Sequence, residues 1–539
     1  MRRRLPPLVL PFLGLLLLLS ACSRRETPAE AGRRTQTLLV GNAAEPADLD
    51  PHTSTVLSDQ NLLLALFEGL TALDEQTSAP VPAAAERWEH SPDGLVWTFH
   101  LRAGLQWSDG DPLTAQDFID SWRRALTPAL AADNAWYLYA IRGAEDFNTG
   151  RAKDPSALGL AAPDDRTIVI TLQQPVPYLP ALVSLPAWFP VNPRVLARFG
   201  GMEKRGTTWT RPGNLVGNGP FLLEEWTPNA RIVMGRNPHH WQAATTRLQR
   251  LVFFPIEKAD DEERAFRAGQ LHVTFNLPVA KLAAWRRQDP ARLRVDPTLQ
   301  SVFLRFNTTR PPLNDARVRR ALSLAVDRDT LARTVLQGSR PPAHTLTPPG
   351  TGGFRPRASV PTDFDSARRL LAEVGFPGGK GFPVLEVQAR NDEIHPRLAE
   401  ALQAIWLREL GVRVSIAQVE QKTWIQNQQT LNYGISTAAW TADFPDPVTF
   451  LGLFAANGTY NWTGWASPEF DALLQQAAAS LDSAPRTELF QQAERRLLEE
   501  APVAPLFFGA QTYLIDPAVR GWEPSLLIFR RYQLVRFDP

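Results

Sequence analysis

The segment AAWTADFPDP, residues 438–447, contains two acids in contrasting surroundings. Asp446 is followed by Pro447 and then by an apolar run, which predicts the N-cap of a helix with proline at its first position. Asp443 has no such local role, and it lies three residues after Trp440 and directly before Phe444. A carboxylate among aromatic residues is costly to bury without a partner, so Asp443 is expected to meet a cation.

Other residue patterns argue against catalysis. The chain contains no G-x-S-x-G and no H-E-x-x-H motif. His239 and His240 are adjacent, but they lack further ligands at metal-site spacing. We therefore expect no enzyme activity, no metal and no cofactor.

The first 36 residues indicate export. Arg2, Arg3 and Arg4 precede the apolar run of residues 8–19, which is too short for a good membrane span and is typical of a signal peptide. The run ends in Leu-Ser-Ala-Cys, which resembles the lipobox of bacterial lipoproteins. Residues 1–21 are the predicted signal peptide, Cys22 the predicted lipidation site and residues 22–36 a flexible lipid-anchored tether. The alternative is an ordinary signal peptide followed by a chance cysteine.

The composition is that of a globular chain of several domains. Hydrophobic residues make up 44% of the sequence and charged residues 21%. Removing residues 1–21, with their three arginines and no acid, changes the net charge from +1 to −2. This balance does not indicate a nucleic-acid surface. The remaining length exceeds one ordinary core, so two or three domains are expected.

Short strands alternate with helices along the chain, which predicts the α/β class. Val96 to Leu101 alternates apolar and polar residues as a half-buried strand does. Thr114 and Asp117 form a potential capping box. Gly411 suits a helix C-cap inside a predicted β-α-β unit. The other predicted strands are 37–41, 166–172, 301–306, 384–388 and 412–419, and the predicted helices are 60–70, 314–336, 395–410, 468–480 and 484–500.

Several longer motifs occur together and in order. They are EPADLDPH (45–52), LFEGL (66–70), the stretch from PAAAERWEH to SWRRAL (82–126), GNGPFLLEEW (217–226), RNPHHW (236–241), FNTTRPPLNDARVRRALSLAVDRDTL (306–331) and ADFPDP (442–447). With them the chain resembles the extracytoplasmic oligopeptide- and dipeptide-binding proteins of bacterial ABC importers, solute-binding protein family 5.

The resemblance implies a type II periplasmic-binding-protein fold with two lobes and an extra domain on the first. Lobe one would comprise residues 37–78, 194–300 and 503–539, the extra domain 79–193 and lobe two 301–502. Two crossings, near 300 and 502, would form a hinge that closes on the ligand. The implied protein is an extracytoplasmic monomer that binds short peptides and delivers them to an ABC permease and ATPase complex.

The resemblance also implies roles for five residues. Asp443 matches the acid that binds the α-amino group of the peptide, a charge-assisted contact, and Trp440 matches an aromatic residue beside the peptide side chains. Thr55 and Leu57 belong to the segment that pairs with the peptide backbone as an added strand would. His395 falls where one relative binds the carboxylate end. The alternative for Asp443 is a salt bridge to an arginine of lobe two.

Two departures leave the ligand open. Gln428 and Thr437 occupy positions where relatives have arginines, so the preferred peptide length is not determined. A nickel-chelate or haem-binding relative of the same fold, which would not need Asp443 as an amine anchor, is the main alternative. A peptide-sensing adaptor without a transport role is another.

Overall fold

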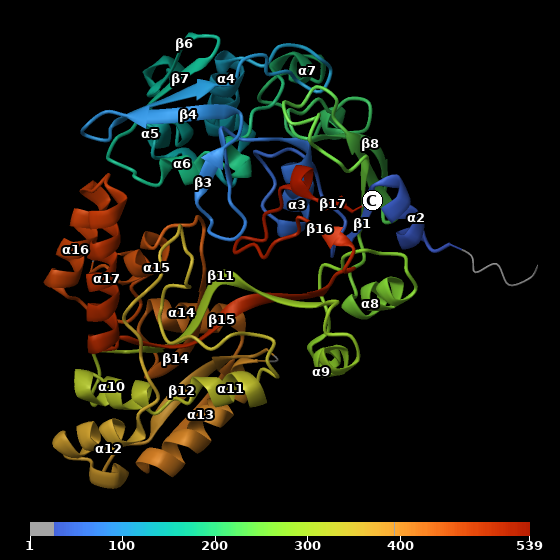
Figure 1. Ribbon diagram of the computed structural model, residues 1–539. Helices are drawn as coiled ribbons and strands as arrows, with labels where there is room; N and C mark the ends of the chain where they lie inside the picture. The colour runs from blue at the N-terminus through green and yellow to red at the C-terminus, as the bar shows by residue number, and fades with distance from the viewer. Residues whose placement is uncertain (1–25, 393, 457, 539) are drawn as a thin grey trace, which may run out of the picture.

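The computed structural model describes residues 26–392, 394–456 and 458–538. Three sheets of four or five strands form the scaffold, and each carries its own helices (Figure 1). Among the described residues, no helix combines the length and apolar character that crossing a membrane requires. The predicted signal peptide and Cys22 lie outside the described residues.

The first sheet is four-stranded, with the spatial order β1-β10-β9-β8. β1 runs parallel to β10, and the other neighbours are antiparallel. All four strands fall within the range predicted for lobe one. The strands are β1 (Thr37–Gly41), β8 (Phe221–Thr227), β9 (Arg231–Arg236) and β10 (Arg250–Phe254), and the helices of this region are α2 (Pro28–Thr35), α3 (Leu57–Leu66), α7 (Pro193–Arg198), α8 (Ala259–Arg267) and α9 (Val279–Gln288).

The second sheet, β4-β5-β7-β6, is antiparallel and falls within the predicted extra domain. Its core is separate from the others and includes the fully buried Trp107, Trp122 and Trp188. The small β2–β3 ribbon precedes it. The elements are β2 (Thr71–Leu73), β3 (Pro80–Pro82), β4 (Ala85–His90), β5 (Val96–Leu101), β6 (Leu160–Asp164), β7 (Thr167–Thr171), α4 (Ala115–Leu126), α5 (Ala144–Asn148) and α6 (Leu179–Leu182).

The third sheet has five strands in the order β13-β12-β14-β11-β15. The predicted β-α-β unit is confirmed, because β12 and β13 are parallel and α13 between them ends at Gly411 in the left-handed conformation. The elements are β11 (Leu293–Phe306), β12 (Leu385–Arg390), β13 (Val414–Val419), β14 (Ile435–Thr441), β15 (Val503–Leu514), α10 (Ala316–Leu324), α11 (Arg328–Thr334), α12 (Phe364–Glu373), α13 (His395–Leu410), α14 (Gln421–Gln429), α15 (Val448–Leu451), α16 (Pro468–Ala479) and α17 (Ser483–Glu500).

The long strands β11 and β15 connect the upper and lower parts of the molecule. They are paired over most of their length and run side by side through the middle of Figure 1. The first half of β15 packs in the core of the third sheet, whereas Tyr513 packs in the core of the first. The chain therefore passes between the two parts within these strands, which contain or adjoin the positions near 300 and 502 predicted for the crossings. The predicted domain bounds otherwise stay a prediction.

The N-terminal stretch corrects the predicted flexible tether of residues 22–36. Its described part contains helix α2, which begins with a capping box between Thr27 and Glu30. The helix is docked, since Ala29 donates its backbone N–H to the Gly269 carbonyl (2.8 Å) and its own carbonyl is bonded to His272 Nε2 (2.8 Å). The sequence does carry a local signal for this helix, the Thr27–Glu30 capping box with Pro28 at its first position. Its docking, in contrast, depends on residues about 240 positions away.

Two predicted helices have different bounds. The long helix of 314–336 is two helices, because Asp327 interrupts it and caps α11 by accepting a hydrogen bond from the Thr330 N–H (3.0 Å). The helix predicted at 60–70 begins earlier, at Leu57, and ends at Leu66. The strand at 96–101 and the capping box at Thr114 are confirmed. The short β16–β17 ribbon (Val519–Arg520 and Arg536–Phe537) closes the chain.

Candidate functional site: a charged cavity between the sheets

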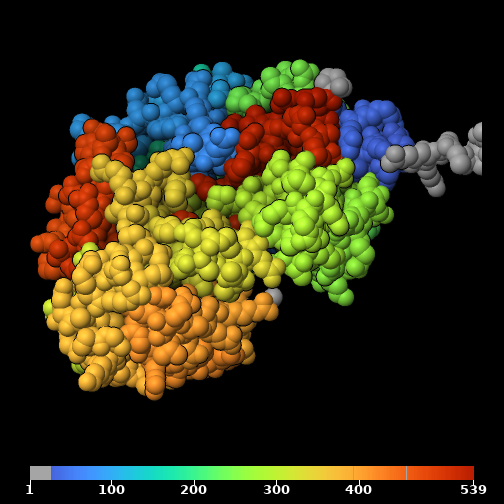
Figure 2. Space-filling model, turned by 60° about the horizontal axis from the view of Figure 1, so that its bottom comes forward, coloured from blue at the N-terminus to red at the C-terminus, as the bar shows by residue number. Residues whose placement is uncertain are grey.

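A cavity of about 450 Å³ lies where the three sheet regions meet. Its walls come from residues 55–60, 134–137, 185–187, 275–276, 298–300, 340, 441–443, 510–511 and 526–529. In the space-filling view a furrow separates the yellow and orange residues of the third sheet region from the blue and red residues above them (Figure 2). Such a position suits a ligand that both parts contact.

Asp443 lines this cavity and is half-buried. Its backbone N–H points toward the Thr449 hydroxyl (3.5 Å), and its carbonyl accepts from the Tyr137 hydroxyl (3.4 Å). Among the described residues its carboxylate forms no ion pair, and burial raises its pKa above the usual value. The cavity therefore contains an acid whose ionised form lacks a cationic partner in the part of the chain that the structure describes.

The neighbouring Asp446 has the ion pair that was the alternative for Asp443. Arg486 donates to both oxygens of Asp446, at 2.6 and 2.8 Å, and both side chains are largely buried. Asp446 also accepts from the Val448 backbone N–H (3.0 Å). The helix begins at Val448, one residue later than expected, so Pro447 takes the cap position. The structural role thus belongs to Asp446 alone.

Thr55 and Leu57 line the same cavity. Within the described part of the chain, no hydrogen bond uses the backbone N–H of Thr55, Val56 or Leu57, so these donors are open to a ligand. The segment is not a strand, however, because Leu57 begins helix α3. Of the predicted pairing segment, Thr55 and Val56 are the residues that precede the helix. The stretch that could pair with a peptide as an added strand is therefore shorter than expected.

Trp440 does not line the cavity. It lies one residue before Thr441 on β14, and successive residues of a strand face opposite sides. Its indole Nε1 donates to the Thr449 hydroxyl (3.4 Å), and its ring centroid is 4.9 Å from that of Tyr460. Its predicted contact with ligand side chains stays a prediction.

His395 is also outside the cavity. Its Nδ1 bonds to Asp392 Oδ2 (2.5 Å) at the start of α13. Burial lowers the pKa of His395 although Asp392 opposes this, so the ring favours the neutral form. Burial alone would raise the pKa of Asp392, but hydrogen bonds from the His395 backbone and the Arg390 side chain bring it to about 2. The structure thus shows no free cation at His395.

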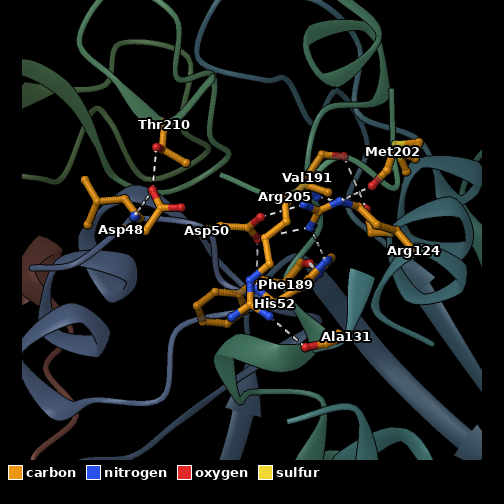
Figure 3. A network of polar contacts seen from close by, with 12 residues as sticks. Asp48, Asp50, His52, Arg124, Ala131, Phe189, Val191, Met202, Arg205 and Thr210 are labelled. Atoms are coloured by element: carbon orange, nitrogen blue, oxygen red, sulfur yellow. Dashed lines mark hydrogen bonds and ion pairs between the residues drawn. The ribbon is translucent and has the colours of Figure 1, made fainter. Parts of the chain in front are cut away.

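A buried network explains one of the sequence motifs. In EPADLDPH, Asp50 accepts two hydrogen bonds from Arg124 of α4, at 3.0 and 2.5 Å (Figure 3). Burial and the Arg124 charge lower the pKa of His52 to about 4, so its neutral ring accepts from Arg124 (2.8 Å) and donates to the Phe189 carbonyl (2.9 Å). The motif is structural, and it fixes the segment that leads into Thr55.

The sequence did not identify two further cavity residues. Tyr137 lies in the range predicted for the extra domain, and Arg340 lies in a loop after α11. Neither occurs in a recognisable motif, so no local signal could have assigned them.

Among the described residues no group of three potential ligands could hold a metal ion. His240 is buried against Glu68 (3.4 Å), and it is therefore a structural residue.

Comparisons with known proteins agree with this architecture. Residues 79–462 match the model of the bacterial extracellular solute-binding proteins, family 5 middle. The periplasmic oligopeptide-binding protein OppA of Escherichia coli K12 is 34% identical over 498 residues, and the match covers 90% of each chain. The probable deoxycholate-binding periplasmic protein YgiS of the same organism is 36% identical over 500 residues, again 90% of each chain.

Solved structures of MppA extend the comparison. The unliganded open form of this periplasmic murein tripeptide binding protein has a TM-score of 0.88 and 32% identity, covering 93% of this chain and 97% of that one. Another structure of MppA from Escherichia coli, also 32% identical and covering 93% and 98%, has a TM-score of 0.67. The α/β fold is therefore that of a periplasmic binding protein. The chain belongs to the bacterial extracellular solute-binding proteins of family 5, a family of binding proteins and not of enzymes.

Proposed function

We propose that this protein binds short peptides in the cavity around Asp443 and delivers them to an ABC permease and ATPase complex. The observation that carries the proposal is the half-buried carboxylate of Asp443, which faces the cavity without a cationic partner among the described residues. A peptide ammonium would supply the missing charge through charge-assisted hydrogen bonds. The names of OppA and MppA, an oligopeptide- and a murein tripeptide-binding protein, support the same ligand class.

Domain closure would complete the site. The higher TM-score with an unliganded open form supports an open arrangement of the lobes in this structure. The paired strands β11 and β15 would act as the hinge, since both run between the two parts. Closing the cleft would remove water from Asp443 and strengthen its contact with an ammonium. A lipid anchor at Cys22 and a monomeric state belong to the same proposal.

A second candidate ligand is an amphipathic carboxylic acid such as the deoxycholate in the name of YgiS. The apolar residues Leu526, Leu527, Ile528 and Phe529 on one wall of the cavity favour it. It would leave the Asp443 carboxylate unpaired, which is why peptides fit the cavity better. The nickel-chelate, haem and sensor-adaptor alternatives lack a supporting feature of this kind.

The two ligand classes can be separated directly. Native mass spectrometry of the purified mature protein would identify the ligand that copurifies with it. After that ligand is removed by unfolding and refolding, calorimetry would compare trialanine and tetraalanine with deoxycholate. We expect peptide masses and binding of both peptides. Binding of deoxycholate without binding of any peptide would contradict the proposed function.

A further inference from the structure

A second charge lines the same cavity. Arg340 is half-buried, and its Nη1 donates to Gln300 Oε1 at 3.0 Å. Its guanidinium carbon lies 5.5 Å from the centroid of the Phe507 ring. It forms no ion pair with a carboxylate in the described part of the chain, and burial lowers its pKa although Asp392 opposes this. A guanidinium has five N–H donors, so most of those on Arg340 remain open to a ligand.

The position of Arg340 is fixed by the sheet. The following residues extend the sheet beyond its edge strand β15, because Pro341 accepts from the Phe508 N–H (2.9 Å) and Ala343 donates to Leu506 (3.1 Å). β15 lies between this segment and β11, which carries Gln300. Gly509 on β15 leaves the necessary room, since a Cβ there would be 2.6 Å from the Cβ of Gln300.

Gln300 links Arg340 to the acid. Its Nε2 donates to the Thr441 hydroxyl (3.0 Å), and the two residues are direct partners across β11 and β14. Asp443 follows Thr441 by two residues, and all four residues line the cavity. Arg340, Thr441 and Asp443 all lie in the range predicted for lobe two. Closing of the lobes would therefore not change their spacing.

The charges of the cavity are complementary. Of the described residues that line it, Asp443 is the one acid and Arg340 the one residue with a cationic side chain. Two other basic side chains bind partners within the protein. Arg305 is fully buried and donates to Gln428 (3.0 Å), and His395 is bonded to Asp392. The positions of the two missing arginines, Gln428 and Thr437, are both buried and do not line the cavity.

We propose that Arg340 binds the carboxylate of the ligand whose ammonium is bound by Asp443. This inference rests on the proposed function and specifies the ligand as a short zwitterion. Two hydrogen bonds and one amide span about 8 Å from Arg340 to the Thr441 hydroxyl. Two further residues extend at most about 7 Å, and the side chains of Thr441 and Asp443 add about 6 Å, so both charges lie within about 20 Å. Allowing about 3 Å for the contact at each end, an extended peptide of roughly three to four residues can reach both.

Longer peptides would behave differently. Arg340 and Leu526 also line an adjoining open groove of about 960 Å³. A peptide of six residues would place its C-terminus past Arg340, in that groove, and its carboxylate would lose the contact. The contribution of the ligand carboxylate to affinity should therefore depend on peptide length.

The test compares free-acid and C-terminally amidated forms of trialanine, tetraalanine and hexaalanine, by calorimetry at pH 7. For the wild type we expect amidation to raise the Kd of the two shorter peptides at least tenfold and that of hexaalanine less than threefold. In Arg340→Gln, the acid and amide of each short peptide should bind equally, whereas N-acetylation should weaken binding as in the wild type. Arg340→Lys should keep part of the difference, because it keeps the charge but not the planar fork.

Two control variants test whether the effect of amidation depends on Arg340 itself or on the loss of any basic side chain. Arg287→Gln removes one exposed positive charge on α9 and should leave the tenfold difference intact. His395→Gln should also leave it intact, whereas loss of the difference there would overturn the assignment to Arg340. Thermal denaturation should show that each variant is folded.

The outcomes distinguish this inference from the proposed function. Peptides that bind the wild type equally as acid and amide would overturn the role of Arg340 and leave peptide binding standing. If no peptide binds the wild type, but deoxycholate does and binds Arg340→Gln at least tenfold more weakly, Arg340 stays a carboxylate-binding residue and the peptide proposal is refuted. A wild type that binds none of these acids would overturn both.

Discussion

Replacing Asp443 by Asn tests the amine contact without changing the shape of the side chain. At an effective dielectric constant of about 20, two unit charges 4 Å apart attract by roughly 4 kcal/mol. Desolvation of the ammonium offsets part of this, and the half-buried position of Asp443 places the pair between an exposed and a buried one. We therefore expect a loss of about 2–3 kcal/mol, or roughly thirty- to more than a hundredfold in Kd, for peptides with a free amine.

Calorimetry with trialanine and N-acetyltrialanine measures this loss. Acetylation should weaken binding to the wild type by a similar factor, but it should have little further effect in Asp443→Asn, because the pair is already broken. Asp365→Asn, which changes an exposed acid on α12, is the matched control and should bind as the wild type does. Equal binding of the free and acetylated peptides to the wild type would refute the reasoning.

The raised pKa of Asp443 gives the same experiment two further readouts. Peptide affinity should fall as the pH drops through this pKa, since a protonated carboxyl no longer attracts the ammonium, and Asp443→Asn should not show that fall. An acid whose pKa is higher in the folded than in the unfolded protein lowers stability once the pH exceeds the unfolded value. At pH 7 the unliganded Asp443→Asn should therefore be at least as stable as the wild type. A clear fall in the melting temperature of Asp443→Asn would contradict the conclusion that burial of the ionised Asp443 lowers the stability of the unliganded protein.

Three other predictions concern the scaffold, closure and anchoring. Arg124→Met should lower the free energy of unfolding by about 3–5 kcal/mol, because it leaves the buried Asp50 unpaired, and urea denaturation followed by Trp fluorescence measures this; an unchanged midpoint would contradict it. Trialanine should reduce the radius of gyration in small-angle scattering, and no change at a concentration where calorimetry shows saturation would count against a hinge. Cys22→Ser should abolish lipid labelling and release the protein from the membrane fraction, whereas a labelled, membrane-bound variant would disprove the lipobox.

The sequence by itself determined those features that depend on neighbouring residues. The alternation of Val96 to Leu101, the capping box at Thr114 and the Gly411 cap each follow from contacts within a few positions, and the structure has all three. The neighbouring residues also indicated that Asp446 has a structural role at a helix start and that Asp443 does not. The break at Asp327 was missed because Asp also occurs within helices, and no local residue marked it as a cap rather than a helix member.

Only the tertiary structure decided which of the candidate residues share a cavity. Asp443, Thr55 and Leu57 meet there, whereas Trp440 faces the other side of its strand and His395 is bonded to Asp392. Arg340 carries no motif, and it reaches the site only because its loop extends the sheet and Gly509 makes room for Gln300. Whether a charge is paired or open to a ligand depends on residues far away in the chain. The spacing of residues in a sequence contains no direct record of those contacts.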